Sequence, residues 1–116
     1  MRLALEVGDG WSTMGLAQYG AVGETWWAGV AQAARRFDDL VDQDGRAFEG
    51  FRRVLDMGAG AGPMTSADKL HDDVARAASL GFTDVVVFWP RASEPFRAEE
   101  STYAEFGARL TDGALD

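Results

Sequence analysis

The clearest periodic pattern in the chain lies between residues 24 and 41. Apolar side chains recur there at helical spacing, which predicts a long helix with one face against a core. The other face carries arginines and aspartates, and the acidic side chains gather where the helix ends. The apolar positions are Trp26, Trp27, Val30, Ala33, Ala34, Phe37 and Leu40, and the acidic cluster comprises Asp38, Asp39, Asp42 and Asp44. The cluster lacks the ligand order of an EF-hand loop, so we interpret it as a solvated helix end.

A short helix is predicted at residues 2–7, where Leu3 and Leu5 give it an apolar side. Residues 8–10 then break it with two glycines. This helix begins at Met1 without a capping residue, and from this we expect that upstream sequence is missing.

Another helix is predicted to begin near Thr65 or Ser66, since Thr65 and Asp68 have the spacing of a capping box. Gly81 stands where a glycine commonly ends a helix. A weaker pattern predicts a last helix over about residues 99–110. Residues 14–23 read as a glycine-containing loop, and residues 42–50 as polar and turn-like.

Three strands are predicted, at residues 11–13, 51–57 and 84–89. The last is a continuous β-branched and aromatic run that Pro90 stops. Such a run is typical of a strand that is covered on both faces, as in parallel sheets with helical layers. The strand centres are far enough apart for a crossover helix in each gap. The sequence therefore predicts an α/β fold in which three parallel strands alternate with helices.

Composition narrows the function classes. The chain has 116 residues, a net charge of -8 and no cysteine. The negative charge disfavours nucleic acid and an anionic membrane surface as partners. The absence of cysteine excludes disulfides and thiolate metal sites. No signal peptide and no membrane-spanning run is evident, so we expect a cytoplasmic protein. We interpret the single histidine, His71, as a partly exposed helical residue rather than a metal ligand.

One segment resembles the first motif of Rossmann-type methyltransferases. It reads VLDMGAGAG, from Val54 to Gly62, and combines an apolar strand, an acid and alternating glycines. Residues 63–65 separate these glycines from the next predicted helix, and the following strand does not end in an acid. We therefore favour a flexible loop and keep a small methyltransferase that uses S-adenosylmethionine as an alternative. Asp56 is interpreted as a buried acid paired with an arginine rather than as a catalytic acid, with Arg52 on the same strand face.

Two segments at opposite ends of the chain carry a different resemblance. Residues 2–11 read RLALEVGDGW, and residues 80–91 read LGFTDVVVFWPR. Both are similar to segments of the luciferase-like family of flavin- or deazaflavin-dependent oxidoreductases and monooxygenases. The first matches a helix that runs into a DGW turn, and the second matches the last barrel strand. The resemblance covers residues 2–97, and residues 98–116 would form a C-terminal helix and tail.

The resemblance implies a partial TIM barrel made of the last three βα units. FMN or a deazaflavin would lie at the barrel mouth, but the loops expected to hold its phosphate are absent from this chain. We therefore expect the chain to be inactive and not to bind the cofactor alone. Barrel geometry predicts that residues at the strand ends face the site. The cofactor-binding candidates are Trp11, Thr13, Met57, Trp89 and Arg91, with Ser12 and Gly58 beside them.

Among these candidates, Trp89 would pack on a ring system and Arg91 would meet a carboxylate or phosphate. No catalytic residue is assigned. A non-enzymatic interaction module is the other alternative, because a three-stranded sheet leaves two open edges through which the chain would associate with itself. A truncated product without a function of its own is also compatible with the sequence.

Overall fold

A computed structural model describes residues 1–44, 50–93 and 97–111 of the chain. Helices and strands alternate along it, as the sequence predicts. The elements are α1 (Arg2–Val7), β1 (Gly10–Thr13), α2 (Glu24–Asp44), β2 (Arg52–Asp56), α3 (Ala67–Ser79), β3 (Asp84–Val86) and α4 (Glu100–Thr111).

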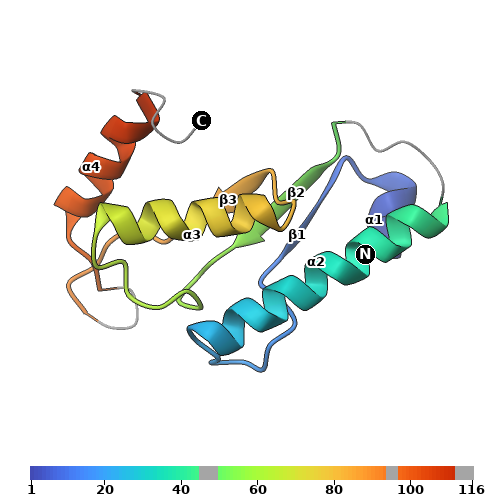
Figure 1. Cartoon of the computed structure of the whole chain (residues 1–116), viewed down its shortest axis with the longest axis horizontal. Coiled ribbons are helices and arrows are strands. Elements are labelled where there is room, and N and C mark those ends of the chain that lie inside the picture. Colours follow the sequence, from blue (N-terminus) through green and yellow to red (C-terminus); the bar gives the residue numbers. More distant parts are fainter. Residues whose placement is uncertain (45–49, 94–96, 112–116) are drawn as a thin grey trace.

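The three strands form one parallel sheet in the order β1-β2-β3, so each strand lies beside its neighbour in the chain. Helix α3 lies over the sheet, and α2 runs along the β1 side (Figure 1). The predicted α/β fold with parallel strands is confirmed. Within the described residues the sheet is open and does not close into a barrel.

The two faces of the sheet differ sharply. Side chains alternate along a strand, so the strand register sorts them into rows on opposite faces. One row is Thr13, Leu55 and Val85, and the other is Ser12, Val54 and Asp84. The first row lies under the helices, where Leu55 is fully buried and Val85 packs against the core. We call this the covered face.

The second row has no part in the hydrophobic core. Ser12 is exposed, Val54 is half-buried, and Asp84 accepts a hydrogen bond from Arg52 (Nε to Oδ2, 3.0 Å) on the same face. We call this the uncovered face, because no described helix packs on it.

Helix α2 supplies most of the aromatic core. Trp26 and Trp27 are 5% and 3% exposed, which confirms that both face inward. Phe37 stacks on Trp11 of β1, with ring centroids 4.8 Å apart, and the Arg53 guanidinium lies 4.5 Å from the Phe37 ring centre. The helix continues to Asp44, so residues 42–44 are helical rather than turn-like. The remainder of that predicted turn, apart from Gly50, lies outside the described residues.

Helix α3 begins at the later of the two predicted positions, Thr65 and Ser66. The N-cap is Ser66, whose hydroxyl oxygen accepts a hydrogen bond from the backbone N–H of Lys69 at 3.1 Å. A serine at this position satisfies one of the donors that a helix start leaves unpaired. At the other end Gly81 has φ +92°, which confirms the predicted glycine stop. Helix α4 packs on α3, and its Tyr103 contacts the same core.

The last strand is shorter than predicted. It ends at Val86 rather than Trp89, because β2, its partner among the described strands, turns away into the glycine-rich loop. The expected coverage of both faces is also wrong, since Val86 is 49% exposed on the uncovered face.

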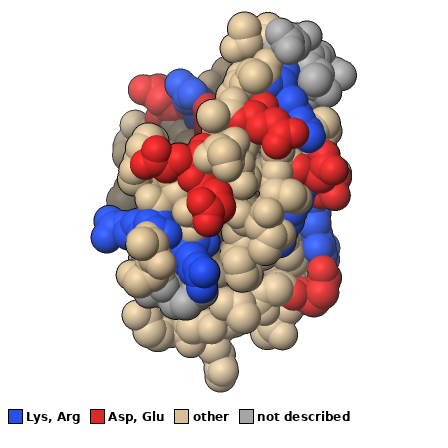
Figure 2. All heavy atoms as spheres, turned by 90° about the vertical axis from the view of Figure 1, so that its left-hand side faces the viewer, with Lys and Arg blue, Asp and Glu red and all other residues tan. Residues whose placement is uncertain are grey.

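Acidic and basic side chains lie in small separate groups on the face shown in Figure 2. That face carries no continuous basic patch of the kind that a nucleic-acid partner requires. None of the helices described here is long and apolar enough to cross a membrane.

Candidate functional site

The carboxyl ends of the three strands meet at one edge of the sheet, because the strands are parallel. Thr13, Asp56 and Val86 are the last strand residues there. In α/β sheets and barrels this edge carries the ligand site. We therefore take this rim, with the loops that leave it, as the candidate site.

Three of the predicted cofactor-binding residues point to the covered face. Trp11 lies between the sheet and α2, stacked on Phe37. Met57 is 1% exposed and belongs to the core. The Thr13 hydroxyl oxygen accepts a hydrogen bond from the backbone N–H of Gly15 at 3.0 Å, which stabilises the turn after β1. These contacts give the three residues structural roles in the described chain.

The other two predicted residues lie beyond the end of β3. Trp89 is 71% exposed, and Arg91 is also exposed. The backbone of Arg91 pairs with that of Arg97 in an isolated parallel bridge, which holds this segment in place. The structure therefore does not bring Trp89 into the buried cluster that contains Met57. A ligand-binding role for Trp89 and Arg91 remains a prediction.

The glycine-rich loop after β2 is packed against α2 rather than open. A Cβ atom at Gly60 would lie 2.3 Å from the Trp26 ring, so only glycine fits beneath the indole. The same indole donates through Nε1 to the carbonyl oxygen of Met14 at 2.9 Å. The Gly60 carbonyl oxygen accepts from the backbone N–H of Gly23 at 2.8 Å. Trp26 and Gly60 therefore join the loops that follow β1 and β2.

Lys69 fastens this loop to α3. Its ammonium group donates to the carbonyl oxygen of Ala61 at 2.9 Å and to Asp73 Oδ2 at 2.7 Å. Asp73 is 8% exposed, so the pair is partly withdrawn from water. Both contacts engage the ammonium group within the protein, so this lysine holds the loop against α3.

Asp56 differs from its sequence-based interpretation. Its Oδ1 atom accepts a hydrogen bond from the backbone N–H of Gly58 at 3.1 Å, and Arg52 pairs with Asp84 instead. The predicted pairing of Asp56 with Arg52 is therefore wrong. The reason lies in the register, which places Asp84 opposite Val54, within reach of Arg52 across the strands. The Arg52 and Thr83 side chains lower the pKa of Asp84 to about 2 by hydrogen bonding to its carboxylate.

Met14 is a rim residue that the sequence interpretation missed. It is 62% exposed, and its methyl group lies 3.7 Å from the position that a Cβ atom would occupy at Gly58. It therefore reaches from the end of β1 across the end of β2. The alternation of Ser12 and Met14 on either side of Thr13 is the signal that would have found it.

Metal-ligating side chains do not gather at this rim. Across residues 1–44, 50–93 and 97–111 no group of three or more such side chains is close enough to hold an ion. His71 lies half-buried on α3, as the partly exposed helical residue that the sequence indicates.

Comparison of the chain with protein-family models, with curated proteins and with solved structures finds no match. The case for a function therefore depends on the geometry of the sheet and on the two sequence segments at residues 2–11 and 80–91.

Proposed function

We propose that this chain forms the C-terminal part of a luciferase-like flavin- or deazaflavin-dependent oxidoreductase barrel and has no oxidoreductase or monooxygenase activity alone. One observation carries the proposal. The sheet is parallel, its strands follow one another in chain order, and the described helices that cover it lie on one face.

Strand order separates the two main α/β architectures. A doubly wound sheet reverses its strand order at a switch point and carries helices on both faces. A barrel adds each strand beside the last and keeps its helices outside. The order β1-β2-β3 has no reversal within the described chain. Successive barrel strands have this order, whereas a complete doubly wound sheet, which the methyltransferase alternative needs, also requires a reversal that these three strands do not show.

The two faces also correspond to the two sides of a barrel wall. The covered face would be the outer side of the barrel, and the uncovered face would line its interior. Parallel sheets are almost always covered on both faces, so a parallel sheet with a bare face is an incomplete unit. Further strands of a barrel would complete it and pair with the open edges of β1 and β3.

The residues present fit a flavin-type cofactor only in part. Trp11 and Met57 are engaged in the core, which leaves Trp89 and Arg91 as the predicted contacts from this chain. Such a cofactor would supply the hydride chemistry, and the protein would orient it. Trp89 would pack against its ring system, and Arg91 would meet an anionic group. Asp56, at the end of β2, would be the acid nearest the mouth.

A titration of the purified chain with FMN and with a deazaflavin tests the expected inactivity. We expect no binding at micromolar concentrations by fluorescence or calorimetry, since one side of the mouth cannot enclose the ligand. Micromolar binding would overturn the claim that the chain is inactive alone.

The DNA upstream of the Met1 codon tests the barrel itself. An in-frame extension that encodes five more strand-helix units is expected, and the extended protein should then bind the cofactor. An upstream region without such units would contradict the proposal. The two experiments are independent, so failure of one does not decide the other.

The methyltransferase alternative gains no support from the glycine-rich loop. The loop lies under Trp26, and α3 begins only at Ala67. A methyl-donor titration followed by melting temperature would distinguish it, because a specific ligand stabilises the fold. One observation favours the alternative of a non-enzymatic interaction module: within the described sheet, β1 and β3 each have an open edge.

A further inference from the structure

Helix α2 carries a regular row of exposed residues on its outer face. Five exposed residues form a stripe along it with the spacing four, three, four, three, which keeps them on one side of the helix. We call this the outer stripe, and it consists of Ala28, Gln32, Arg35, Asp39 and Asp42. Trp27, Val30, Ala34 and Phe37 lie on the opposite side, in the core.

The charges of the outer stripe lie in an unusual order. Arg35 comes first, and Asp39 and Asp42 follow toward the C-terminal end, where the helix has no basic residue in its last turn. Acidic side chains near a helix C-terminus oppose the helix dipole. Within residues 1–44, 50–93 and 97–111, no ion pair is formed by Arg35, Asp39 or Asp42. Asp38 on the same helix, in contrast, pairs with Arg53 at 2.6 Å.

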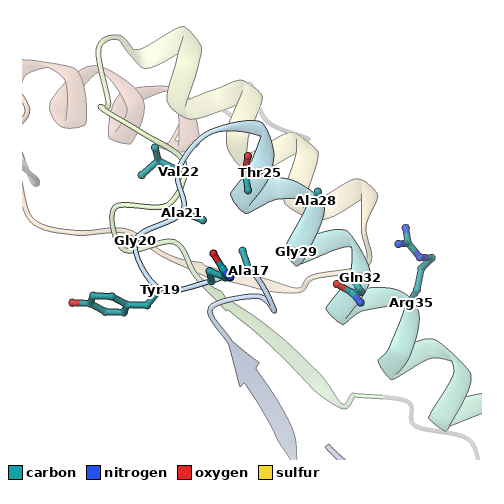
Figure 3. A pocket seen from close by; sticks show the side chains of 11 residues that line it. Ala17, Tyr19, Gly20, Ala21, Val22, Thr25, Ala28, Gly29, Gln32 and Arg35 are labelled. Carbon is teal, nitrogen blue, oxygen red and sulfur yellow. The ribbon is translucent and has the colours of Figure 1, made fainter.

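A groove runs along the N-terminal half of this stripe (Figure 3). It has a volume of about 820 Å³ and lies between α2 and the loop at residues 17–22. The loop can approach the helix closely because Gly29 has no side chain. A Cβ atom at that position would lie 2.4 Å from the Ala17 nitrogen. Arg35 is the only charged residue among those that line the groove, and Val22 at its other end is 57% exposed.

We propose that a second copy of this chain binds along the outer stripe of α2, with the two helices antiparallel. Arg35 of each copy then faces Asp39 of the other, and Gln32 faces Asp42. The acidic end of one helix thereby enters the groove whose single charge is positive. A twofold axis repeats each contact, as in most homodimers.

Charge order selects the antiparallel arrangement. Parallel helices in register would place Arg35 against Arg35 and Asp39 against Asp39, and like charges repel. The antiparallel arrangement places Arg35 of each copy opposite Asp39 of the other, and Asp42 opposite the uncharged Gln32. The interface is small and its ion pairs are exposed, so the dimer should be weak and salt-sensitive. This inference does not depend on the proposed function, since it uses α2 and its loop alone.

Sedimentation equilibrium of the whole chain at rising concentration tests the proposal. We expect a reversible monomer-dimer equilibrium that shifts toward monomer at high salt. Arg35→Asp should weaken the dimer at least about tenfold, because the new aspartate of each copy would face Asp39 of the other copy. Asp39→Arg should weaken it similarly by placing two arginines together. Asp72→Arg, on the exposed side of α3, makes the same charge change as Asp39→Arg and should leave the dimer intact.

The decisive step is to mix the two weakened variants. In a heterodimer of Arg35→Asp with Asp39→Arg, positions 35 and 39 again face each other with opposite charges, so dimer formation should recover. This rescue cannot come from effects within one helix, because each variant keeps its own altered helix. Circular dichroism verifies that both variants are folded. Three results would overturn the proposal: a monomer at all concentrations, single variants that dimerise like the original chain, or a mixture without recovery.

The same experiment distinguishes association through the open sheet edges. Edge pairing of β1 or β3 involves no residue of α2. A self-association that persists equally in both variants would assign the contact to the strand edges and reject the outer stripe.

Discussion

Leu55 and Val54 are neighbours in β2, yet their surroundings have little in common. Leu55 is fully buried under α2 and α3, whereas Val54 lies half-buried in a row with Ser12 and Asp84. The covered face is an aromatic and aliphatic core, and the uncovered face carries a hydroxyl, a carboxylate and an ion pair. The comparison shows that the described helices cover this sheet on one face only. The barrel proposal follows from that asymmetry.

The largest expected difference between the faces is in stability. Leu55→Ala removes a buried side chain under two helices and should lower the free energy of unfolding by about 2–5 kcal/mol. Val54→Ala, one residue away, should cost about 1 kcal/mol or less, because Val54 is partly in water already. Urea denaturation of both variants measures the difference. Equal losses would mean that both faces are covered in solution.

Gly60→Ala probes the contact between the glycine-rich loop and the covered-face core. The new methyl group would meet the Trp26 ring, and the expected loss is about 1–3 kcal/mol. Gly107→Ala in α4 is the matched control, since no atom lies within 4 Å of its Cβ position. The control should be neutral or stabilise the chain by up to about 1 kcal/mol, as alanine favours helices. A Gly60→Ala variant as stable as the control would show that the loop does not rest on Trp26.

Ser66→Ala removes the cap of α3, the helix that covers β2. The expected cost is about 1 kcal/mol, because the Lys69 N–H loses its acceptor. Ser66→Asp keeps an acceptor in place and should retain most of the stability. Thermal unfolding of the two variants gives the comparison, and an equal loss in both would contradict the capping role.

The uncovered face should contribute a small effect that depends on pH. The pKa of Asp84 is about 2 in the folded chain and lies below its ordinary value of 3.8. Its ion pair with Arg52 therefore stabilises the fold above about pH 4, and this contribution is lost as the pH falls toward 2. Asp84→Asn should weaken the dependence of stability on pH between 4 and 2. An unchanged pH profile would mean that the ion pair does not form in solution.

The sequence predicted the covered side of the fold well. Helical spacing identified Trp26, Trp27 and Phe37 as core residues, and Gly81 marked a helix end. These features depend on local patterns, which is why they could be read without the structure. The length of the short last strand could not be predicted from a local pattern, because it is set by the partner strand β2.

The surroundings of the candidate site residues were harder to predict. Trp11 and Met57 were chosen for their position at strand ends, but that criterion ignores which face a side chain points to. Strand alternation and register decide this, and they place both residues under the helices. The pairing of Arg52 with Asp84 rather than Asp56 also depends on register between strands about 30 residues apart in sequence, which no local pattern specifies.

The most direct test of the asymmetric sheet uses two adjacent positions in β3. The chain has no cysteine, so Val85→Cys and Val86→Cys each introduce a single thiol, on the covered and the uncovered face respectively. Labelling with a thiol reagent under native conditions should be slower at position 85, because Val85 is partly buried against the core. Position 86 should react faster, because Val86 is 49% exposed on the uncovered face. Strong protection at both positions would contradict an uncovered face and, with it, the basis of the barrel proposal.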